Sequence, residues 1–344
     1  MTLDSISSLN AQAAVAPVQG EVFCQVAQKN IKTTKTNKPY LEVTLADVGG
    51  SMTIKVWDNA DWYPAFSALQ VNDVVAVTGN WQVGQYGLEG TALDVRPLMS
   101  EEEERLLAGG ADLCRIQREA WEYILQAIAT IADPRLRALS EKLVGGFEAR
   151  FRRSGAARKN HHARRGGLVE HTSAVMRNAA AICTAYPNLN RDLLLAGALF
   201  HDCGKMWENP YEEHSLVMPY TDMGEMLGHI TVGIEIINKL WGDLMADEQL
   251  KSEWKHLQPS SDQVRLHLLH LVASHHGILE YGSPVVPKTP EALALNHADD
   301  LDAKMEMFRV AYAEAPELAP HIQQRVFPLP SNVVKPLPAW EAGE

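Results

Sequence analysis

The sequence predicts a multi-domain α+β protein in which a small β-barrel precedes an all-α helical bundle. Short segments rich in β-branched residues are confined to the first hundred residues, whereas helical periodicity dominates from residue 100 to about residue 313. At 344 residues the chain is longer than a typical single-core domain. These three observations favour two domains of different secondary structure.

The first domain is expected to be a small closed barrel. Strand-like segments occur at residues 21–27, 39–47, 51–57 and 73–79, with a further pair at 81–83 and 88–95. Five or six short strands within about 80 residues suit such a barrel. Residues 1–16 are small and polar, which predicts a flexible arm ahead of a barrel at residues 17–98.

The rest of the chain is expected to be helical up to a proline-rich tail. Predicted helices cover residues 115–131, 135–151, 168–186, 191–200, 226–241, 260–274 and 290–312. We expect a helical linker at residues 99–160, a helical domain at 161–315 and an extended tail at 316–344 that lies on the body of the protein.

Composition limits the partners and the compartment. The formal charge of −12 provides no general attraction for nucleic acids or anionic membranes, so a polyanion site requires a local basic patch. The four cysteines lack the paired spacing of a disulfide scaffold or zinc cluster. With neither a signal peptide nor a membrane-length apolar run visible, we expect a reducing, cytoplasmic location. The oligomeric state stays open, including a homo-oligomer.

The pair His201-Asp202 is the first candidate for a metal site. It ends the apolar segment at residues 193–200, and Mn²⁺, Fe²⁺, Co²⁺ and Zn²⁺ accept imidazole and carboxylate ligands together. A lone pair of this kind is more often a surface pair or a helix cap. Its significance comes from further histidines and an aspartate on apolar segments, namely His171, His229, His275, His276 and Asp299. A buried aspartate needs a strong partner, and a cation is one.

This ordered set resembles the H…HD…D signature of the HD-domain metal-dependent phosphohydrolases, an all-α family. The resemblance implies that Asp202 bridges two ions. It also implies one site completed by His171, His201 and Asp299, and a second completed by His229 with His275, His276 or both. Asp300 and Asp302 compete with Asp299, which the local Ala-Asp-x-Leu-Asp-Ala pattern favours.

Longer blocks resemble the YhaM-type 3′→5′ exoribonucleases, in which a barrel of the OB type precedes the HD domain. The blocks are residues 161–172, 186–197, 228–230, 274–277 and 281–284, and the likeness extends from about residue 20 to residue 338. It implies an OB-fold nucleic-acid-binding domain at residues 17–98 and an HD phosphohydrolase domain at 161–315.

Phosphodiester hydrolysis requires an activated water and neutralisation of charge on the phosphate, which two ions about 3.5–4 Å apart can supply. We expect two divalent ions, with Mn²⁺ preferred and Fe, Co, Ni, Mg or Zn as alternatives. Lys205 lies three residues after Asp202 and is expected to face a phosphate oxygen. From the residues alone, a lysine favoured at a helix C-terminus explains it equally well.

A dense basic segment precedes His171. Such a run is usually a solvated face, but its position next to the proposed metals favours contact with substrate phosphates. The expected phosphate-binding residues are Arg158, Lys159, His161, His162, Arg164 and Arg165.

On the barrel, Trp81 and Tyr86 flank a hairpin turn and are the expected base-stacking residues. Phe23, Tyr40 and Trp57 are expected to alternate into the barrel core. Four lysines between Lys29 and Lys38 make that loop a candidate phosphate contact.

The function that these expectations favour is 3′→5′ exonucleolytic hydrolysis of single-stranded RNA, with DNA as an alternative substrate, to nucleoside 5′-monophosphates. Two other functions are considered. One is an HD phosphohydrolase acting on small nucleotides or cyclic dinucleotides, and the other is a non-catalytic single-strand binder with a structural metal centre.

Overall fold

The structure is a computed structural model that describes residues 2–3, 5–34, 36–84 and 87–339. It divides into two compact units. The first comprises Met1–Glu119 with Pro210–Pro219, and the second comprises Ala120–Asn209 with Tyr220–Glu344.

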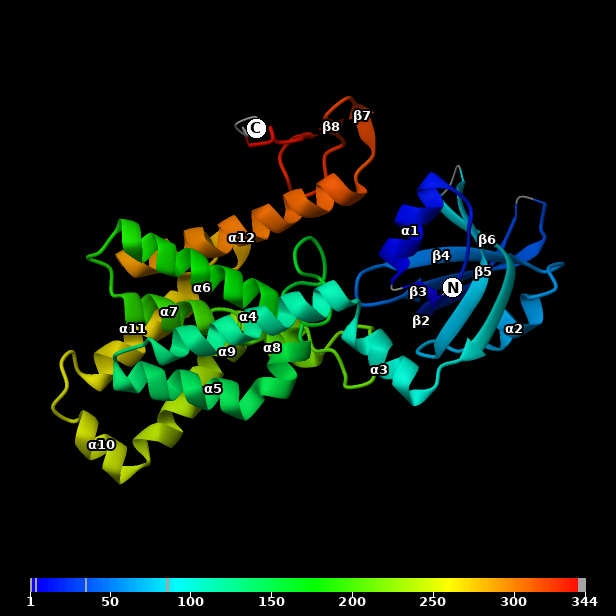
Figure 1. Ribbon diagram of the computed structural model, residues 1–344. Coiled ribbons are helices and arrows are strands. Elements are labelled where there is room, and N and C mark those ends of the chain that lie inside the picture. Colours follow the sequence, from blue (N-terminus) through cyan, green and yellow to red (C-terminus); the bar gives the residue numbers. More distant parts are fainter. Residues whose placement is uncertain (1, 4, 35, 85–86, 340–344) are drawn as a thin grey trace, which may run out of the picture. The chain divides into compact units, whose positions relative to one another are not determined.

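The first unit contains a curled antiparallel sheet (Figure 1) with the strand order β4-β3-β2-β5-β6. The strands are β2 (Val18–Thr33), β3 (Pro39–Ala46), β4 (Ser51–Trp57), β5 (Val74–Gly84) and β6 (Gly87–Pro97), and the short helix α2 covers Tyr63–Ala68. Strands β4 and β6, at the two ends of this order, also contact each other. The sheet therefore curls into a small barrel, as the strand pattern predicts.

The alternation of side chains between the two faces of a strand decides which aromatic side chains face outward. In β5, Val75, Val77 and Trp81 share the buried face, and the Trp81 indole Nε1 donates a hydrogen bond to the Gly20 carbonyl oxygen at 3.1 Å. Trp81 is fully buried, so the expectation that it stacks on bases is wrong. Because side chains alternate between the two faces of a strand, the position of Trp81 in β5 directs the ring into the core even though the residue lies close to the turn. Tyr86, the other expected stacking residue, lies outside the described residues.

The same alternation places Tyr40 and Trp57 on the outer face, contrary to expectation. The inward positions of β3 and β4 are held by aliphatic residues such as Leu41 and Val56, so their neighbours face solvent. Tyr40 and Trp57 are opposite each other in the β3–β4 register, with ring centroids 5.0 Å apart. Phe23 is buried, but not in the barrel core as expected: it packs with Leu106 of a following helix.

The N-terminal residues are folded onto the barrel, which corrects the predicted flexible arm. Strand β1 (Thr2–Leu3) pairs with β2, and helix α1 covers Ile6–Val15. Ile6, Leu9 and Ala13 recur at helical spacing and are buried in the barrel core. This short apolar periodicity was the available signal in a segment of otherwise small, polar residues.

Seven of the remaining helices lie close to their predicted bounds, α3 falls within the predicted helical linker, and α8 and α10 are additional. The bounds are α3 (Ser100–Ala108), α4 (Ala111–Ala129), α5 (Pro134–Arg153), α6 (Gly167–Ala185), α7 (Arg191–Phe200), α8 (Lys205–Glu208), α9 (Asp222–Met245), α10 (Glu248–Trp254), α11 (Ser261–Ser274) and α12 (Pro290–Glu314). In the described part of the chain, no helix combines the length and apolar character needed to span a membrane.

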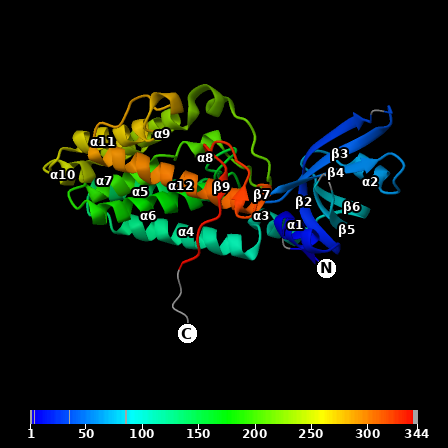
Figure 2. The same cartoon turned by 90° about the horizontal axis from the view of Figure 1, so that it is seen from above.

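Helix α7 lies at the centre of the second unit. Every residue from Leu193 to Phe200 is buried, and the helix contacts α5, α6, α11 and α12, as Figure 2 shows for its close neighbours α5 and α6. Because α7 has no polar face, it is enclosed by its neighbours. The two residues that follow it, His201 and Asp202, therefore enter the interior of the bundle, where both are at most 1% exposed.

The structure divides the chain differently from the prediction in three places. The predicted linker at 99–160 is split at residue 120, and Trp121 and Ile124 of α4 belong to the helical core. The segment Pro210–Pro219 interrupts the helical domain and packs with the first unit through Leu216. The predicted extended tail forms a small sheet of β7 (Glu317–Ala319), β8 (Ile322–Gln323) and β9 (Val333–Val334).

Candidate metal centre

Five helices of the second unit bring the expected ligands together. His171 lies near the start of α6, His201 and Asp202 follow α7, and His229 lies on α9. His275 and His276 follow α11, and Asp299 lies on α12. Helix α9 is interrupted at Gly228, whose φ of 68° and ψ of 162° are readily adopted only by glycine. This break directly precedes His229.

The two oxygens of the Asp202 carboxylate face different pairs of imidazoles. Oδ2 lies 3.4 Å from Nε2 of His171 and 3.4 Å from Nε2 of His201. Oδ1 lies 3.5 Å from Nε2 of His229 and 3.6 Å from Nε2 of His275. Asp202 therefore stands between two groups of nitrogen ligands, which suits a carboxylate that bridges two ions.

Asp299 and His276 complete the two groups. Asp299 Oδ1 lies 3.1 Å from Nε2 of His171, on the side of Asp202 Oδ2. His276 joins His229 and His275 in a cluster whose candidate ligand atoms all lie within 4.8 Å of one another. Both histidines of the 275–276 pair thus remain candidates for the second group.

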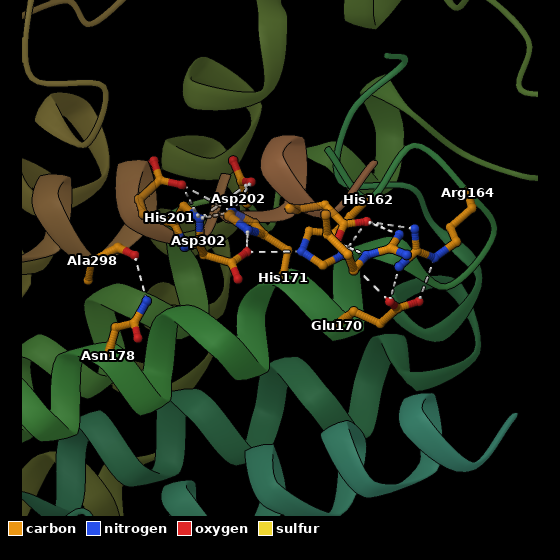
Figure 3. Close-up of polar contacts among 12 residues, drawn as sticks. His162, Arg164, Glu170, His171, Asn178, His201, Asp202, Ala298 and Asp302 are labelled. Atoms are coloured by element: carbon orange, nitrogen blue, oxygen red, sulfur yellow. Dashed lines mark hydrogen bonds and ion pairs between the residues drawn. The ribbon is translucent and has the colours of Figure 1, made fainter. Parts of the chain in front are cut away.

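All five imidazoles hold Nδ1 against an oxygen acceptor. His171 Nδ1 contacts Asp302 Oδ2 at 2.7 Å, as Figure 3 shows, and His229 Nδ1 contacts Glu208 Oε2 at 3.0 Å. In the other three the acceptor is a backbone carbonyl oxygen: Ala198 for His201 at 2.8 Å, Val272 for His275 at 2.7 Å and Tyr281 for His276 at 2.6 Å. An acceptor at Nδ1 requires the proton there, which leaves the Nε2 lone pair for a metal.

The electrostatics also suit a cation. Burial opposes ionisation of Asp202, but the Lys205 ammonium and the imidazoles of His201 and His171 hold the pKa of its carboxyl well below its usual range. Burial lowers the pKa of His229 and, with His275, lowers that of His276 to about 3. An ionised carboxylate and neutral imidazoles are the forms that bind divalent ions.

Buried polar atoms without hydrogen-bond partners test whether the residues fit such ions. Among the described residues, both Asp202 oxygens, His229 Nε2 and His275 Nε2 are buried and have no partner of acceptable hydrogen-bond geometry. The Lys205 ammonium forms an ion pair with Asp202 Oδ2 at 2.8 Å. Unsatisfied buried acceptors are costly, and cations between them would remove that cost, so the donor set fits divalent metal ions.

Comparison with known proteins identifies both halves of the chain. The HD domain family matches residues 168–304, a range that contains all seven candidate ligands. The OB-fold nucleic acid binding domain family matches residues 25–98. The chain is 33% identical over 276 residues to the 3′-5′ exoribonuclease YhaM of Bacillus subtilis (strain 168), which covers 78% of this chain and 80% of that protein.

The chain belongs to the YhaM family of 3′-5′ exoribonucleases. A second YhaM, from Bacillus velezensis (strain DSM 23117 / BGSC 10A6 / LMG 26770 / FZB42), is 32% identical over 271 residues. The predicted fold class is confirmed, as are the family and the enzyme class, a metal-dependent phosphodiesterase. Divalent metal binding is implied by the HD domain and by the His/Asp clusters.

In this YhaM-family chain, part of the predicted phosphate-binding segment has another role. Arg164 forms hydrogen bonds with Glu170 (Figure 3) and, at 2.9 Å, with Glu306. His162 is 8% exposed and contacts Asp302 at 3.0 Å. Arg164 is held by the buried carboxylates of Glu170 and Glu306, and His162 by the half-buried Asp302, so the structure gives both side chains internal partners in place of a phosphate. Asp302 and Glu306 lie four residues apart on α12, and Glu170 lies on α6. Sequence position alone does not show that these acids converge on the loop.

The other four basic-segment residues are placed differently. His161 lies beside the metal centre, with its ring centroid 5.6 Å from that of His171. The Arg158 guanidinium lies 3.9 Å from the ring centroid of Tyr220. Lys159 is exposed and Arg165 is half-buried. A role in phosphate contact for these four stays a prediction.

Asp302 and Glu208 each contact Nδ1 of a candidate ligand histidine, a role that the sequence does not predict for either residue. The sequence pattern presents Asp302 only as a competitor of Asp299 for the metal, whereas in the structure its carboxylate contacts Nδ1 of His171. Its spacing of three residues from Asp299 on one helix face was the available signal. For Glu208, which also accepts a hydrogen bond from the His229 backbone N–H at 3.1 Å, there was no signal in the sequence.

We predict that Asp302→Asn weakens metal binding about 10- to 100-fold, as is typical when a partner of a ligating histidine is lost. The amide can donate a hydrogen bond to Nδ1 and so favour the wrong tautomer of His171. The measurement is metal affinity by titration calorimetry with Mn²⁺. The matched control is Asp300→Asn, because Asp300 pairs with Lys304 on the surface of the same helix. Equal affinities in wild type and Asp302→Asn would contradict the assigned role.

Proposed function

We propose that this protein is a metal-dependent 3′→5′ exoribonuclease that hydrolyses single-stranded RNA, and single-stranded DNA as a second substrate, to nucleoside 5′-monophosphates. The observation that carries the proposal is the Asp202 carboxylate, whose two oxygens face separate pairs of imidazoles at 3.4–3.6 Å. Membership of the YhaM family supports the polarity and the polymer class.

The proposed metal is Mn²⁺, with two ions per site. When bound, two such ions lower the pKa of a water and neutralise charge on the scissile phosphate. Asp202 would be shared between them. His171, His201 and Asp299 would hold one ion, and His229, His275 and His276 would hold the other.

Lys205 is proposed to contact a phosphate oxygen at this centre. Its side chain is buried, its Nζ lies 2.8 Å from Asp202 Oδ2, and the residue lines a cavity together with Asp299. Burial opposes its charge, but Asp202 raises the pKa of Lys205 above its usual value, so the ammonium persists at neutral pH. A fixed positive charge facing the cavity favours a polyanion there despite the acidic chain.

The outer face of the barrel is proposed to hold the strand. The Tyr40–Trp57 ring pair replaces Trp81 as the candidate for base stacking, because Trp57 is 45% exposed. Lys32 lies opposite Tyr40 on β2, and Lys55 is two residues from Trp57 on the same face. Aromatic rings flanked by lysines suit sequence-tolerant binding of unpaired bases.

We predict that Trp57→Ala weakens binding of a single-stranded oligonucleotide by about 1–3 kcal/mol, the usual effect of losing a base-stacking ring. Fluorescence anisotropy with a labelled RNA measures the affinity. Trp57→Phe is the control that retains a ring, and thermal unfolding should be unchanged because the side chain is exposed. An unchanged affinity in Trp57→Ala would show that strands bind elsewhere.

Digestion of 5′-end-labelled RNA with Mn²⁺ tests the proposed function. The expected result is a ladder that shortens from the 3′ end, with nucleoside 5′-monophosphates as products. Hydrolysis of cyclic dinucleotides or free nucleotides without attack on oligomers would instead support a small-nucleotide phosphohydrolase. Tight binding without turnover under any divalent ion would support a non-catalytic binder.

A cytoplasmic location is part of the proposal. All four cysteines, Cys24, Cys114, Cys183 and Cys203, carry free thiols in the structure, and three of them are buried. Free thiols in this number suit a reducing compartment.

A further inference from the structure

A cavity of about 560 Å³ opens beside the metal centre within the second unit. One part of its wall is polar and includes Lys205, His276 and Asp299. Another part is apolar and includes Ile278, Tyr281, Pro287 and Leu293. The cavity therefore offers charge where a phosphate would react and apolar surface a short distance away.

The apolar wall is exposed although its residues are large. Tyr281 is 70% exposed, Leu293 51% and Ile278 43%. An exposed cluster of this kind at the rim of a polar site is typical of ligand contact.

Hydrogen bonds fix the position of Tyr281 relative to the metal centre. Its carbonyl oxygen is the acceptor for His276 Nδ1 at 2.6 Å, and it ends the short 3₁₀ helix Leu279–Tyr281. At the start of the same loop, Asn296 Nδ2 donates to the His275 carbonyl oxygen at 2.8 Å. The loop that carries the aromatic ring is therefore tied at both ends to the histidine pair and to α12.

A ligand that matches this cavity has an anionic group joined to a flat, weakly polar group. A nucleotide at the end of a strand has this composition, and the volume lies in the range of small-ligand pockets, about 300–1000 Å³. An unpaired base presents its faces for stacking, and every base has such a face.

We propose that this cavity is the subsite for the 3′-terminal nucleotide, with its base against Tyr281 and its phosphate towards Lys205. The inference rests on the proposed function and adds a residue that binds the base without selecting its identity. Stacking and apolar contact distinguish little between bases, so the subsite accepts any unpaired terminal nucleotide. A terminal base that is paired in a duplex cannot enter it.

The test compares Tyr281→Ala with wild type on two RNA oligomers that differ only at the 3′ end. One ends in an ordinary nucleotide and the other in an abasic nucleotide analogue. For wild type, we expect kcat/KM for removal of the ordinary nucleotide to exceed that for the abasic one by about 5- to 150-fold, the range that base stacking provides. In Tyr281→Ala the two values should converge, because the lost ring matters only when a base is present.

Three controls make the result specific. Tyr281→Phe should retain the wild-type preference. Tyr186→Ala removes another exposed tyrosine, 66% exposed and at the far end of α6 from His171, and should change nothing. The bound Mn²⁺ of Tyr281→Ala should equal that of wild type, because the hydrogen bond to His276 Nδ1 is accepted by the Tyr281 backbone carbonyl, which alanine retains.

A wild-type enzyme that removes ordinary and abasic ends equally well would overturn the subsite, and so would a Tyr281→Ala variant that keeps the preference. Either result would leave the exonuclease assignment intact. A wild-type protein that shortens neither oligomer would overturn the proposed function and the subsite with it.

Discussion

Asp202→Asn is expected to reduce the rate of RNA hydrolysis by about 10³-fold or more. The substitution keeps the shape of the side chain but removes the charge that faces four imidazole Nε2 atoms at 3.4–3.6 Å. Loss of metal-ion stabilisation costs several kcal/mol of transition-state free energy, and each 1.36 kcal/mol is about tenfold in rate. Single-turnover hydrolysis of end-labelled RNA measures the loss.

The matched control for this substitution is Asp243→Asn on α9, an exposed aspartate whose side chain is 50% accessible. It should leave both activity and metal content unchanged. Folding of Asp202→Asn should be checked by thermal unfolding, so that lost activity is not mistaken for lost structure. A folded Asp202→Asn protein with near wild-type turnover would refute the assigned role of this carboxylate.

Gly204→Ala is expected to destabilise the helical unit severely, by about 4 kcal/mol or more, the range of the most damaging single substitutions. A Cβ at this position would lie 1.9 Å from the His229 carbonyl oxygen and 2.7 Å from its carbonyl carbon. The obstructing atoms belong to the backbone of α9, so no side-chain rotation relieves the overlap. This close approach of the turn after Asp202 to His229 brings the two ligand groups together.

The control is Gly242→Ala, which lies on α9, the helix that Gly204 packs against. Apart from its chain neighbours and the surrounding helix backbone, no heavy atom of the described residues lies within 4 Å of its added Cβ. Alanine in a helix is favoured over glycine by about 0.5–1 kcal/mol. Relative to wild type, the midpoint of chemical denaturation should therefore fall in Gly204→Ala and rise in Gly242→Ala. Equal stability of Gly204→Ala and wild type would mean that α9 and this turn are not packed as described.

Local patterns in the sequence were sufficient for most of the helices and for the burial of His201 and Asp202. The segment before His201 is apolar on all sides, so the whole of α7 is buried, and the residues that follow it, including Asp202, lie in the interior. The resemblance of the ordered His and Asp residues to a known signature supplied the division into two groups. Helix bounds followed from prolines and caps, such as Pro290 at the start of α12.

What the sequence could not provide was the partner of each polar side chain. His162 and Arg164 look like a basic, phosphate-binding loop, yet Glu170, Asp302 and Glu306 hold them through contacts that span up to 142 positions. The acceptors behind the five imidazoles include three backbone carbonyls, which carry no residue-specific signal.

The error at Trp81 had a different cause. Val75 and Val77 define the inward face of β5, and Trp81 shares that face, whereas its closeness to a turn wrongly suggests exposure. The same alternation, applied to β3 and β4, identifies Tyr40 and Trp57 as outward-facing.

Anomalous X-ray scattering at the manganese edge, from crystals of the protein grown with Mn²⁺, tests the central claim most directly. The account predicts two peaks, one on either side of the Asp202 carboxylate. One should lie among His171, His201 and Asp299, and the other among His229, His275 and His276. A single peak, or two peaks that do not share Asp202, would contradict the two-metal centre.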